Sequence, residues 1–343
     1  MPTVHGASEE FAEMAILARS FQTSKMLEVA VMLELADRIN DRPRHAHELA
    51  SECGAEPEML LRLCRALAAF GIFTVDSEGY VGNSQKSRWL RKDTHPTLHH
   101  AIRYWMMPST WTVWGNLEHA VRSGKAPFES IFGMPYFDYL KTQPAQAKLF
   151  DSHMQNSPDD RHAAVVEAYD FSGAASVVDV GGGNGALLAA ILAANSGVRG
   201  VLLDQEPVVL AANSILGPLA QRCTIHPGSF FDSLPAGGDI YMLSQILHDW
   251  NDERCLKILA NCHAAMNKGG RLLVIERVLD AAPSQSNRMD YFTDMHMMML
   301  FPGAKERTSK EFARLFREAG FSEPGLIRTR SPYWIVETRP ACF

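Results

Sequence analysis

Apolar positions change their spacing along the chain near residue 176. In the N-terminal half they recur at helical intervals, as in Met26, Val29, Ala30 and Leu33, which occupy positions i, i+3, i+4 and i+7. Beyond residue 176, short uninterrupted apolar runs alternate with helical patterns, which is typical of strands buried in a parallel sheet. The pattern therefore predicts a mainly helical N-terminal part followed by an α/β part.

The apolar runs define the expected sheet. Its central strands are expected at 177–180, 200–204, 223–226, 239–243 and 271–276. Residues 326–329 and 333–336 are expected to form a terminal antiparallel pair, and Thr308 with Glu311 resembles a capping box for the helix before them. This order predicts an α/β fold with an open, Rossmann-like doubly wound sheet.

The N-terminal part follows the order helix, turn, helix, hairpin over residues 47–81, which is the order of a winged helix. Winged helices commonly bind DNA, and Arg62 and Arg65 offer two cations, but their neighbours are acidic or apolar. We therefore predict a dimerisation unit. Because the helices within residues 8–39 carry more apolar surface than their neighbours can cover, we also predict a homodimer.

The predicted domains are a helical winged-helix dimerisation domain at 1–93, a helical connecting region that contributes to the acceptor pocket at 94–170, and a Rossmann-like catalytic domain at 171–343.

A glycine-rich turn follows the first expected strand. Gly181 and Gly183 let a ligand approach the backbone closely, and the helix after them presents unpaired N–H groups. Asp204 ends the next strand, where the ribose of a nucleoside expects a carboxylate. Gly181, Gly183 and Ala186 also satisfy a dinucleotide-binding pattern, so an NAD-dependent oxidoreductase is an alternative. Asp179 argues against it, because its carboxylate would repel a pyrophosphate and attract a sulfonium or ammonium group.

A histidine follows the fourth expected strand. His248 and Asp249 stand beyond residues 239–243, at the edge where ligands bind in open α/β sheets. Glu276 ends the next strand, and Glu306 supplies a further carboxylate. A histidine at a strand end with acidic neighbours is a candidate general base.

The charge composition indicates which classes of binding partner to exclude. The 33 basic and 39 acidic side chains leave a net charge of −6, which argues against nucleic acid and anionic membranes. The 6 cysteines lack zinc-type spacing, and no stretch has the pattern of a signal peptide or membrane span, so we expect reduced thiols and a cytoplasmic protein. His95, His99 and His100 have no carboxylate at ligand spacing and are expected at the surface or at helix caps.

Several longer motifs support a family resemblance. They are DVGGGNG at 179–185, LLD at 202–204, LHDWND at 247–252, GGRLLVIE at 269–276 and GAKERTSKEF at 303–312. Over nearly the whole chain, the sequence resembles the class I S-adenosylmethionine-dependent O-methyltransferases of the hydroxyindole and caffeic-acid type. It looks especially similar to bacterial antibiotic-tailoring members that methylate phenazines and polyketides.

The resemblance, together with the positions named above, gives a set of expected site residues. The expected cofactor-binding residues are Asp179, Gly181, Gly183, Asp204, Ser229, Phe230, Ser244 and Trp250. The expected catalytic residues are His248 as general base, with Glu276, Glu306 and Asp249 around it. The expected substrate pocket includes Met154, Met297, Met298 and Phe301, although Met also fills many protein cores. Ser229 departs from the pattern, because many members of the family carry an acid there, and Ser244 stands where the plant enzymes often carry Lys.

The expected reaction follows from this set. The resemblance implies methyl transfer from S-adenosylmethionine to a phenolic or N-hydroxyl oxygen of an aromatic, polycyclic secondary metabolite, without a metal ion. One alternative is a relative that binds the same cofactor but catalyses hydroxylation, decarboxylation or cyclisation, since a fold does not fix a function. The others are the NAD-dependent oxidoreductase and a ligand-responsive DNA-binding regulator.

Overall fold

The computed structural model describes residues 8–156, 160–210, 212–279 and 282–341. The chain divides into two compact units, one formed by residues 1–114 and 140–158 and the other by residues 115–139 and 159–343. The predicted connecting region 94–170 contributes to both units. The predicted domain limits at residues 93 and 170 stay predictions.

The first unit is mainly helical. Its helices are α1 (Glu9–Ala18), α2 (Ser20–Met32), α3 (Leu35–Ile39), α4 (Ala46–Cys53), α5 (Pro57–Ala69), α6 (Gln85–Arg88), α7 (His99–Trp105), α8 (Pro108–Trp114) and α12 (Pro144–Gln155). Its strands are β1 (Arg44–His45), β2 (Phe73–Val75) and β3 (Tyr80–Asn83), which form an antiparallel sheet in the order β1-β3-β2. The helices α4 and α5 followed by the β2–β3 hairpin confirm the predicted winged helix, to which β1 adds a strand that the sequence pattern did not predict.

The helical spacing correctly predicted the core of α5 but not that of α2. Proline at the first position and the Glu56 cap start α5, whose Leu60, Cys64 and Leu67 are buried. In α2 the buried residues are Ala30 and Val31, whereas Val29 is 40% exposed. The expectation that His99 lies at the surface was wrong. It is 1% exposed, and its Nδ1 lies 3.3 Å from the carbonyl oxygen of Leu90.

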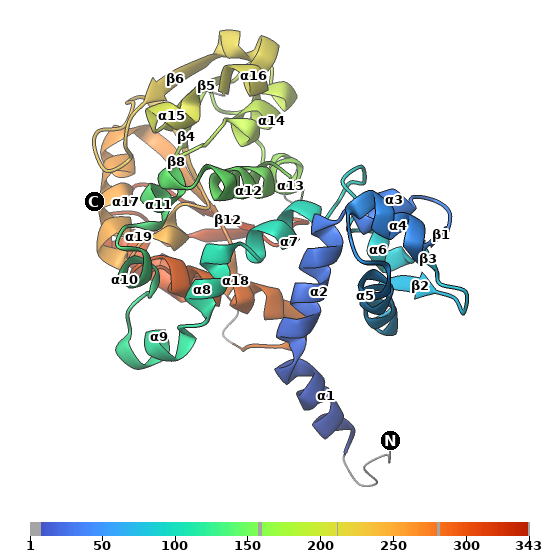
Figure 1. Cartoon of the computed structure of the whole chain (residues 1–343). Helices are drawn as coiled ribbons and strands as arrows, with labels where there is room; N and C mark the ends of the chain where they lie inside the picture. Colours follow the sequence, from blue (N-terminus) through green and yellow to red (C-terminus); the bar gives the residue numbers. More distant parts are fainter. Residues whose placement is uncertain (1–7, 157–159, 211, 280–281, 342–343) are drawn as a thin grey trace. The chain divides into compact units, whose positions relative to one another are not determined.

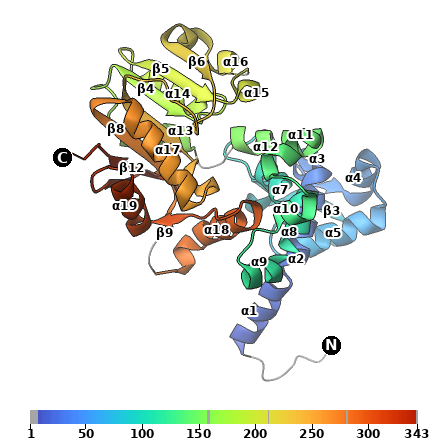
Figure 2. The ribbon, with the colours of Figure 1, turned by 90° about the vertical axis from the view of Figure 1, so that its left-hand side faces the viewer.

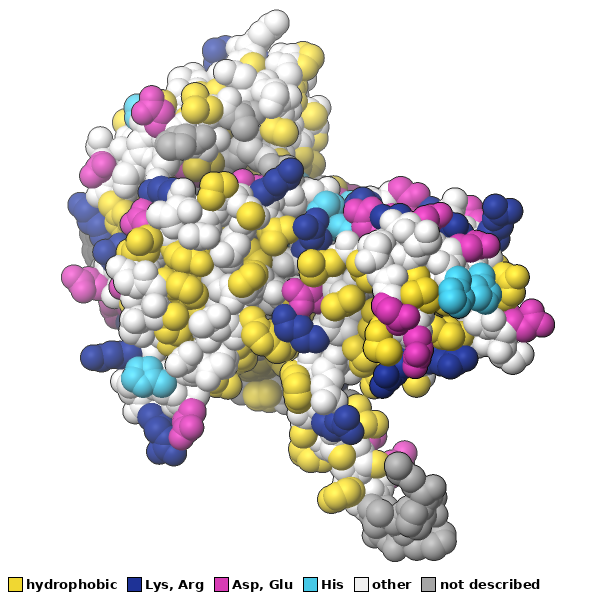
Figure 3. Space-filling model, viewed as in Figure 1, with side chains coloured by type: hydrophobic (Ala, Val, Ile, Leu, Met, Phe, Trp, Pro, Cys, Tyr) yellow, Lys and Arg dark blue, Asp and Glu magenta, His cyan; other side chains and the backbone are white. Residues whose placement is uncertain are grey.

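Helix α1 buries none of its residues within the chain. Figure 3 shows hydrophobic side chains on the visible surface of this helix. Its large apolar side chains, Phe11, Met14, Ile16 and Leu17, are each at least 60% exposed. A contiguous apolar surface of this kind marks an interaction site.

The second unit contains the main sheet. Its helices are α9 (Leu117–Ser123), α10 (Phe128–Phe132), the first residues of α11 (Tyr136–Thr142), α13 (Arg161–Ala168), α14 (Ala186–Ala194), α15 (Glu206–Val209), α16 (Ala212–Leu216), α17 (Asp252–Ala265), α18 (Arg288–Leu300) and α19 (Ser309–Glu318), with short 3₁₀ turns η1 (Gly217–Arg222), η2 (Leu247–Asp249) and η3 (Gln285–Asn287). Its strands are β4 (Ser176–Val180), β5 (Arg199–Asp204), β6 (Cys223–Pro227), β7 (Gly238–Ser244), β8 (Met266–Glu276), β9 (Val278–Leu279), β10 (Arg307–Thr308), β11 (Gly325–Arg328) and β12 (Trp334–Thr338).

The sheet has the order β11-β12-β8-β7-β4-β5-β6 (Figure 1). Strands β8, β7, β4, β5 and β6 are parallel, and the antiparallel pair β11–β12 extends the β8 edge. Every expected strand is present, which confirms the doubly wound prediction. The order reverses between β4 and β7, and ligands bind beyond the carboxyl ends of strands at such a switch point.

Alternate side chains of the strands build two apolar layers. Val177, Leu202 and Ile240 pack with α13, α14 and α16 on one face. Val178, Leu203 and Tyr241 pack with α17 and α19 on the other, and Figure 2 shows α17 lying along the sheet. Among the described residues, no helix is both long enough and apolar enough to cross a membrane.

Candidate functional site

The turn between β4 and α14 holds its glycines in conformations that other residues avoid. Gly181 has φ +71° and Gly183 has φ +60°, both in the left-handed region. A Cβ on Gly181 would lie 2.6 Å from Cδ1 of Ile246 and 3.3 Å from the ring of Phe230, so three segments of the second unit meet here. A Cβ on Gly183 would meet no atom within 4 Å. The turn is therefore closely packed against Ile246 and Phe230 at Gly181, and it is open at Gly183.

Asp179 lies buried beneath this turn. It is 1% exposed, and a Cβ on Gly182 would come within 2.5 Å of its carboxyl group. Neither carboxyl oxygen has a hydrogen-bond partner within the part of the chain that the structure describes. Burial, and then the neighbouring Asp204, raise the pKa of Asp179 to about 7. A buried carboxyl without a hydrogen-bond partner, next to a turn that is open at Gly183, is suited to a cation.

Asp204 supports the same turn from the end of β5. Its Oδ2 accepts the backbone N–H of Gly183 at 2.8 Å, and its Oδ1 accepts that of Gln205 at 2.7 Å. Burial raises its pKa, and the two N–H groups act in the opposite direction. A carboxylate has about four lone-pair sites, so two remain available for hydroxyl groups.

Aromatic side chains form the next part of this edge. The ring of Phe230 lies 6.0 Å from that of Trp250, and the ring of Phe231 lies 4.8 Å from Trp250 in an edge-to-face arrangement. The guanidinium of Arg254 lies over Trp250 at 4.9 Å. Ser229, just before these rings, accepts the N–H of Phe231 at 3.2 Å. The predicted Phe230 and Trp250 are thus neighbours, whereas Phe231 and Arg254 were not predicted.

The backbone beyond β7 bends sharply after Ser244. Gln245 adopts φ +55°, a left-handed conformation that is uncommon outside glycine and marks local strain. The bend directs the backbone N–H groups of Ile246 and Leu247 to the same oxygen, Oε1 of Glu276, at 2.9 Å each. Glu276 is 1% exposed, and its other oxygen remains available on the side of His248.

His248 follows this bend and lies among carboxyl groups. Its Nδ1 lies 3.0 Å from Oε1 of Glu306 and 3.3 Å from Oε2 of Glu276, and its Nε2 lies 3.4 Å from Oδ1 of Asp249. Burial lowers the pKa of the imidazole, but the charges of Glu276, Glu306 and Asp249 outweigh it and raise the pKa to about 10. Since an ionised carboxylate only accepts hydrogen bonds, Nδ1 carries the proton shared with Glu306.

The pKa values of the carboxyl groups around His248 are also shifted. Burial raises the pKa of Asp249 to about 6 and that of Glu276 to about 7, while His248 opposes both shifts. Ligand atoms of His248, Glu276 and Glu306 all lie within 4.8 Å of one another, a spacing that a divalent cation can bridge. The expected absence of a metal ion therefore stays a prediction.

The expected substrate-pocket residues fall in both units. Met297 is 7% exposed in α18, and Met298 beside it is half-buried. The ring of Phe301 lies 5.3 Å from Tyr136 and 5.4 Å from Phe137, two aromatic neighbours that the spacing alone did not assign to the pocket. Met154 lies in α12 of the first unit.

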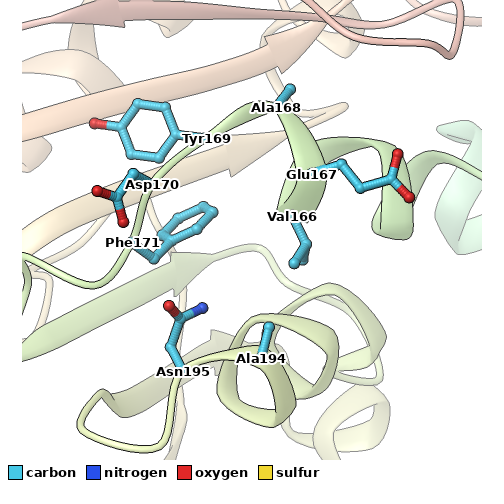
Figure 4. A pocket seen from close by; sticks show the side chains of 8 residues that line it. All are labelled: Val166, Glu167, Ala168, Tyr169, Asp170, Phe171, Ala194 and Asn195. Atoms are coloured by element: carbon cyan, nitrogen blue, oxygen red, sulfur yellow. The ribbon is translucent and has the colours of Figure 1, made fainter.

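A separate hollow of about 470 Å³ lies away from these residues. Figure 4 shows it between the end of α13, with Val166 and Glu167, and the end of α14, with Ala194 and Asn195. The end of α14 is opposite to the glycine turn, which lies at its start. The hollow is therefore at the other edge of the sheet and has no part in the site.

One buried residue of the site was missed by the sequence analysis. The side chain of Arg307 is fully buried and binds the backbone on both sides of His248. Its position beside Glu306 was visible in the sequence, but burial of an arginine has no sequence signal. Asp294, which accepts the N–H of Glu306 at 2.9 Å, was missed for the same reason.

The residues at this edge fit S-adenosylmethionine. The unpartnered Asp179, the open glycine turn, the free lone pairs of Asp204 and the rings at 230 and 250 offer partners for a cation, a close backbone contact, a ribose and a purine. The pattern matches the expected nucleoside cofactor with a positive centre.

Comparison with known proteins identifies the family. The model of the O-methyltransferase domain matches residues 114–322, and that of the O-methyltransferase dimerisation domain matches residues 16–93. Phenazine O-methyltransferase PhzM of Lysobacter antibioticus is 37% identical over 323 residues, which cover 93% of each chain. A mitomycin biosynthesis 6-O-methyltransferase of Streptomyces lavendulae is 36% identical over 322 residues, covering 93% of this chain and 91% of that protein.

A solved structure supports the same assignment. NcsB1, an O-methyltransferase from neocarzinostatin biosynthesis in complex with S-adenosylmethionine and 2-hydroxy-5-methyl naphthoic acid, superposes with a TM-score of 0.80 at 32% identity, covering 93% of this chain and 96% of that one. These matches confirm the resemblance, the fold class and the cofactor expected from the sequence. The chain therefore belongs to the O-methyltransferase family and is an S-adenosylmethionine-dependent O-methyltransferase.

Proposed function

We propose that this enzyme methylates a hydroxyl group of an aromatic, polycyclic secondary metabolite, with His248 as the general base. The observation that carries the proposal is the position of His248, whose Nδ1 faces the buried carboxyl groups of Glu276 and Glu306. This arrangement fixes the ring through Nδ1, so Nε2, which lies 3.4 Å from Oδ1 of Asp249, is the nitrogen that takes up a proton. Because the surrounding carboxyl groups raise the pKa of His248 to about 10, the unprotonated base is a small fraction at neutral pH, and its share grows as the pH rises.

A base is needed because the acceptor is weak. A phenol with a pKa of about 10 is only about 0.1% ionised at pH 7. When bound, S-adenosylmethionine supplies an activated methyl group on a sulfonium, so the protein mainly aligns the acceptor oxygen and removes its proton. His248 receives that proton at Nε2, and Glu306 with Glu276 stabilises the imidazolium formed. Proton transfer of this kind contributes on the order of a hundredfold to ten-thousandfold in rate.

The cofactor would be held by residues of four segments, each at or after the end of a strand of the sheet. Gly181 and Gly183 would line its methionine part above Asp179, and Asp204 would bind the ribose hydroxyls. Phe230 and Trp250 would contact the purine, next to Ser229 and near the end of β7 at Ser244. The support for this assignment is the open turn, the free lone pairs of Asp204 and the clustered rings.

The acceptor class rests on two kinds of support. One relative above is named a phenazine O-methyltransferase and the other a mitomycin biosynthesis 6-O-methyltransferase, and the solved structure holds a naphthoic acid. In this chain Phe301, Tyr136 and Phe137 form an aromatic cluster near the start of the segment that carries Glu306. Flat aromatic acceptors suit such surfaces.

We also propose that the enzyme acts as a homodimer. The first unit contains the dimerisation domain of the family, and α1 exposes a row of large apolar side chains. Exposed apolar surface of this extent is covered by a partner in stable assemblies.

The test uses radiolabelled methyl groups on S-adenosylmethionine with a panel of hydroxyphenazines and hydroxynaphthoic acids. The native enzyme is expected to label at least one acceptor, and His248→Ala is expected to lower kcat on the order of a hundredfold or more, with affinity for S-adenosylhomocysteine unchanged within about twofold. His119→Ala, at an exposed histidine of α9, is the matched control and should leave the rate unchanged. An unchanged rate in His248→Ala would contradict the base assignment.

A further inference from the structure

We propose that Arg307 is a positioning residue: its guanidinium fixes the turn that carries His248 and thereby sets the imidazole against its carboxyl partners. The inference rests on the proposed role of His248 as the base. Arg307 binds the backbone of the turn that carries His248, so its effect must pass through His248.

The guanidinium holds the turn on both sides of the histidine. Nη1 of Arg307 donates to the carbonyl oxygen of Leu247 at 2.7 Å, and Nη2 donates to the carbonyl oxygen of Trp250 at 2.8 Å. Nη2 also donates to Oδ1 of Asp252, the first residue of α17, at 2.8 Å. The Arg307 side chain is fully buried, and these contacts satisfy its two terminal nitrogens, whereas its Nε has no hydrogen-bond partner among the described residues.

The residues before Arg307 hold the histidine itself. The backbone N–H of Lys305 donates to the carbonyl oxygen of His248 at 3.0 Å. Oε1 of Glu306 lies 3.0 Å from Nδ1 of the same residue. Three consecutive residues, 305–307, therefore bind the backbone of the turn and the ring that it carries.

This segment is itself anchored to the rest of the unit. Arg307 pairs with Val278 in the parallel β10–β9 ladder, and the N–H of Glu306 donates to Asp294 of α18. Through this segment, the turn of His248 is tied to β9 and to α18. These contacts fix the position of the turn relative to the sheet.

The chemistry of the site selects arginine. The carbonyl groups of Leu247 and Trp250 lie at the end of a 3₁₀ turn, where their other partners are weak: the thiol of Cys255 reaches both oxygens, and the N–H of Trp250 reaches that of Leu247 at 3.3 Å. The guanidinium gives each carbonyl a shorter, charge-assisted hydrogen bond. A planar guanidinium spans two carbonyl oxygens and a carboxylate at once, whereas the single ammonium of lysine is a point charge on a flexible stem. Replacing the guanidinium with the ammonium of lysine keeps the charge but loses this three-way contact, so it should loosen the turn.

The charge of Arg307 has a second effect on the same cluster. Burial raises the pKa of Glu276, and the charge of Arg307 is among the influences that lower it. The charged groups of this cluster are His248, Asp249, Glu276 and Glu306, with Asp252 and Arg307 behind the turn. Asp294 of α18 and Arg277 also interact electrostatically with Glu306. Removing the cation raises the affinity of the cluster for protons.

The experiment compares Arg307→Lys, which keeps the charge, with Arg307→Met, which removes it. Arg314→Met is the matched control, because Arg314 also pairs with Asp252 but is 42% exposed and contacts neither carbonyl. Arg307→Lys is expected to lower kcat by about tenfold to a hundredfold, since a small misplacement of a catalytic group has this effect, while affinity for S-adenosylhomocysteine and KM for the acceptor change less than about twofold. Arg307→Met should in addition move the acidic limb of the kcat/KM profile to higher pH.

Testing Arg307→Lys in an enzyme that already lacks His248 distinguishes a positioning role from a general loss of structure. In a His248→Ala enzyme, Arg307→Lys should lower the residual rate no further, because the residue acts through His248. An equal further loss in that background would overturn the proposal, and so would a rate in Arg307→Lys within about twofold of the control.

Two further measurements keep the outcomes distinct. If His248→Ala leaves the rate unchanged, the proposed function fails; if it lowers the rate while Arg307→Lys does not, only the Arg307 inference fails. If the Arg307 variants do not fold, Asp252→Ala decides, since it removes the carboxylate partner of the guanidinium and keeps both carbonyl contacts. It should lower kcat severalfold with unchanged S-adenosylhomocysteine affinity, and an unchanged kcat would overturn the proposal.

Discussion

Nδ1 of His248 lies 3.0 Å from Oε1 of Glu306, a residue 58 positions further along the chain. The contact joins the turn after β7 to the segment before α19. Because Nδ1 donates to this carboxylate, Glu306 sets both the tautomer of the imidazole and part of its raised pKa.

Glu306→Gln should therefore shift the pH dependence of the enzyme downward. Removing one negative charge lowers the pKa of His248 from its value of about 10, so the acidic limb of kcat/KM moves to lower pH. The maximal rate should fall about tenfold to a hundredfold, because the imidazolium loses its charged partner. Full pH profiles of kcat/KM check both effects.

The control for this change is Glu318→Gln, at a carboxylate of α19 whose side chain is 44% exposed. It should move neither the limb nor the maximum. A limb that stays in place or moves to higher pH in Glu306→Gln would show that Glu306 does not govern the charge of His248.

Local pattern predicted the sheet well. Strands β4, β5, β7 and β8 each contain a short apolar run, whereas β6 is mixed, and the capping box of Thr308 and Glu311 starts α19 as expected. In contrast, the burial of Val31 rather than Val29 in α2 depends on which face its neighbours cover, which spacing alone does not show. His99 is buried for the same reason.

The site was predictable where it lies at strand ends. Asp179, Asp204, Glu276 and His248 could be placed because strands of one sheet end at a common edge. The left-handed Gln245 and the buried Arg307 could not, since both are imposed by contacts between distant segments. Position in sequence thus predicts which groups meet, and the tertiary contacts decide how they are oriented.

Asp179→Asn should stabilise the cofactor-free enzyme in a pH-dependent manner. The pKa of Asp179 is raised to about 7 by burial, so its neutral form is favoured in the fold and stability is lost as pH rises from the unfolded value to about 7. Three pKa units correspond to about 4 kcal/mol, and an unpaired buried amide costs about 1 to 3 kcal/mol. The net gain should be about 1 to 3 kcal/mol at pH 8, and near pH 4, where the penalty of the ionised carboxylate is gone and only the amide cost remains, the variant should be less stable than the native enzyme.

Denaturant unfolding at several pH values measures this gain. It should increase from pH 4 to pH 7 and stay constant above. Asp170→Asn, at an exposed aspartate whose pKa is lowered by the hydroxyl and N–H of Ser172, is the control and should show no such gain. Destabilisation by Asp179→Asn at pH 8 would mean that the carboxylate has an ionised partner in solution.

Ser229→Asp should tighten cofactor binding if this residue contacts the purine. A carboxylate accepts the exocyclic amino group of adenine in a charge-assisted hydrogen bond, which is worth about 1.5 to 3 kcal/mol, or roughly tenfold to a hundredfold in Kd. Calorimetric titration with S-adenosylhomocysteine measures the change. The inosine analogue, which carries an oxygen in place of the amino group, should bind more weakly to the variant, and equal gains for both ligands would place residue 229 away from the base edge.

The exposed face of α1 should control assembly. Phe11 is 66% exposed and Leu17 is 62% exposed within the chain, and burying each in a partner contributes about 1.5 to 3 kcal/mol. Light scattering is expected to give the mass of a dimer for the native enzyme and a lower dimer affinity for the double substitution Phe11→Glu and Leu17→Glu. Glu9→Lys with Glu13→Lys, at exposed polar positions of the same helix, controls for charge alone. A native enzyme of monomeric mass would contradict the assignment.

Metal ions should be dispensable and, in excess, inhibitory. His248, Glu276 and Glu306 offer ligand atoms within 4.8 Å, yet these are the groups that the proposed mechanism uses to take up and stabilise a proton. A zinc ion bound there would occupy the nitrogen or its carboxyl partners, and imidazole with carboxylate oxygens is a donor set that zinc accepts. Treatment with EDTA should leave kcat unchanged, whereas added Zn²⁺ should lower it, less so at low pH, where protons compete for the same ligands. Glu306→Gln should weaken the inhibition by removing one ligand. Loss of activity on chelation, restored by a divalent metal, would instead make the three groups a required metal site and would end the general-base interpretation of His248.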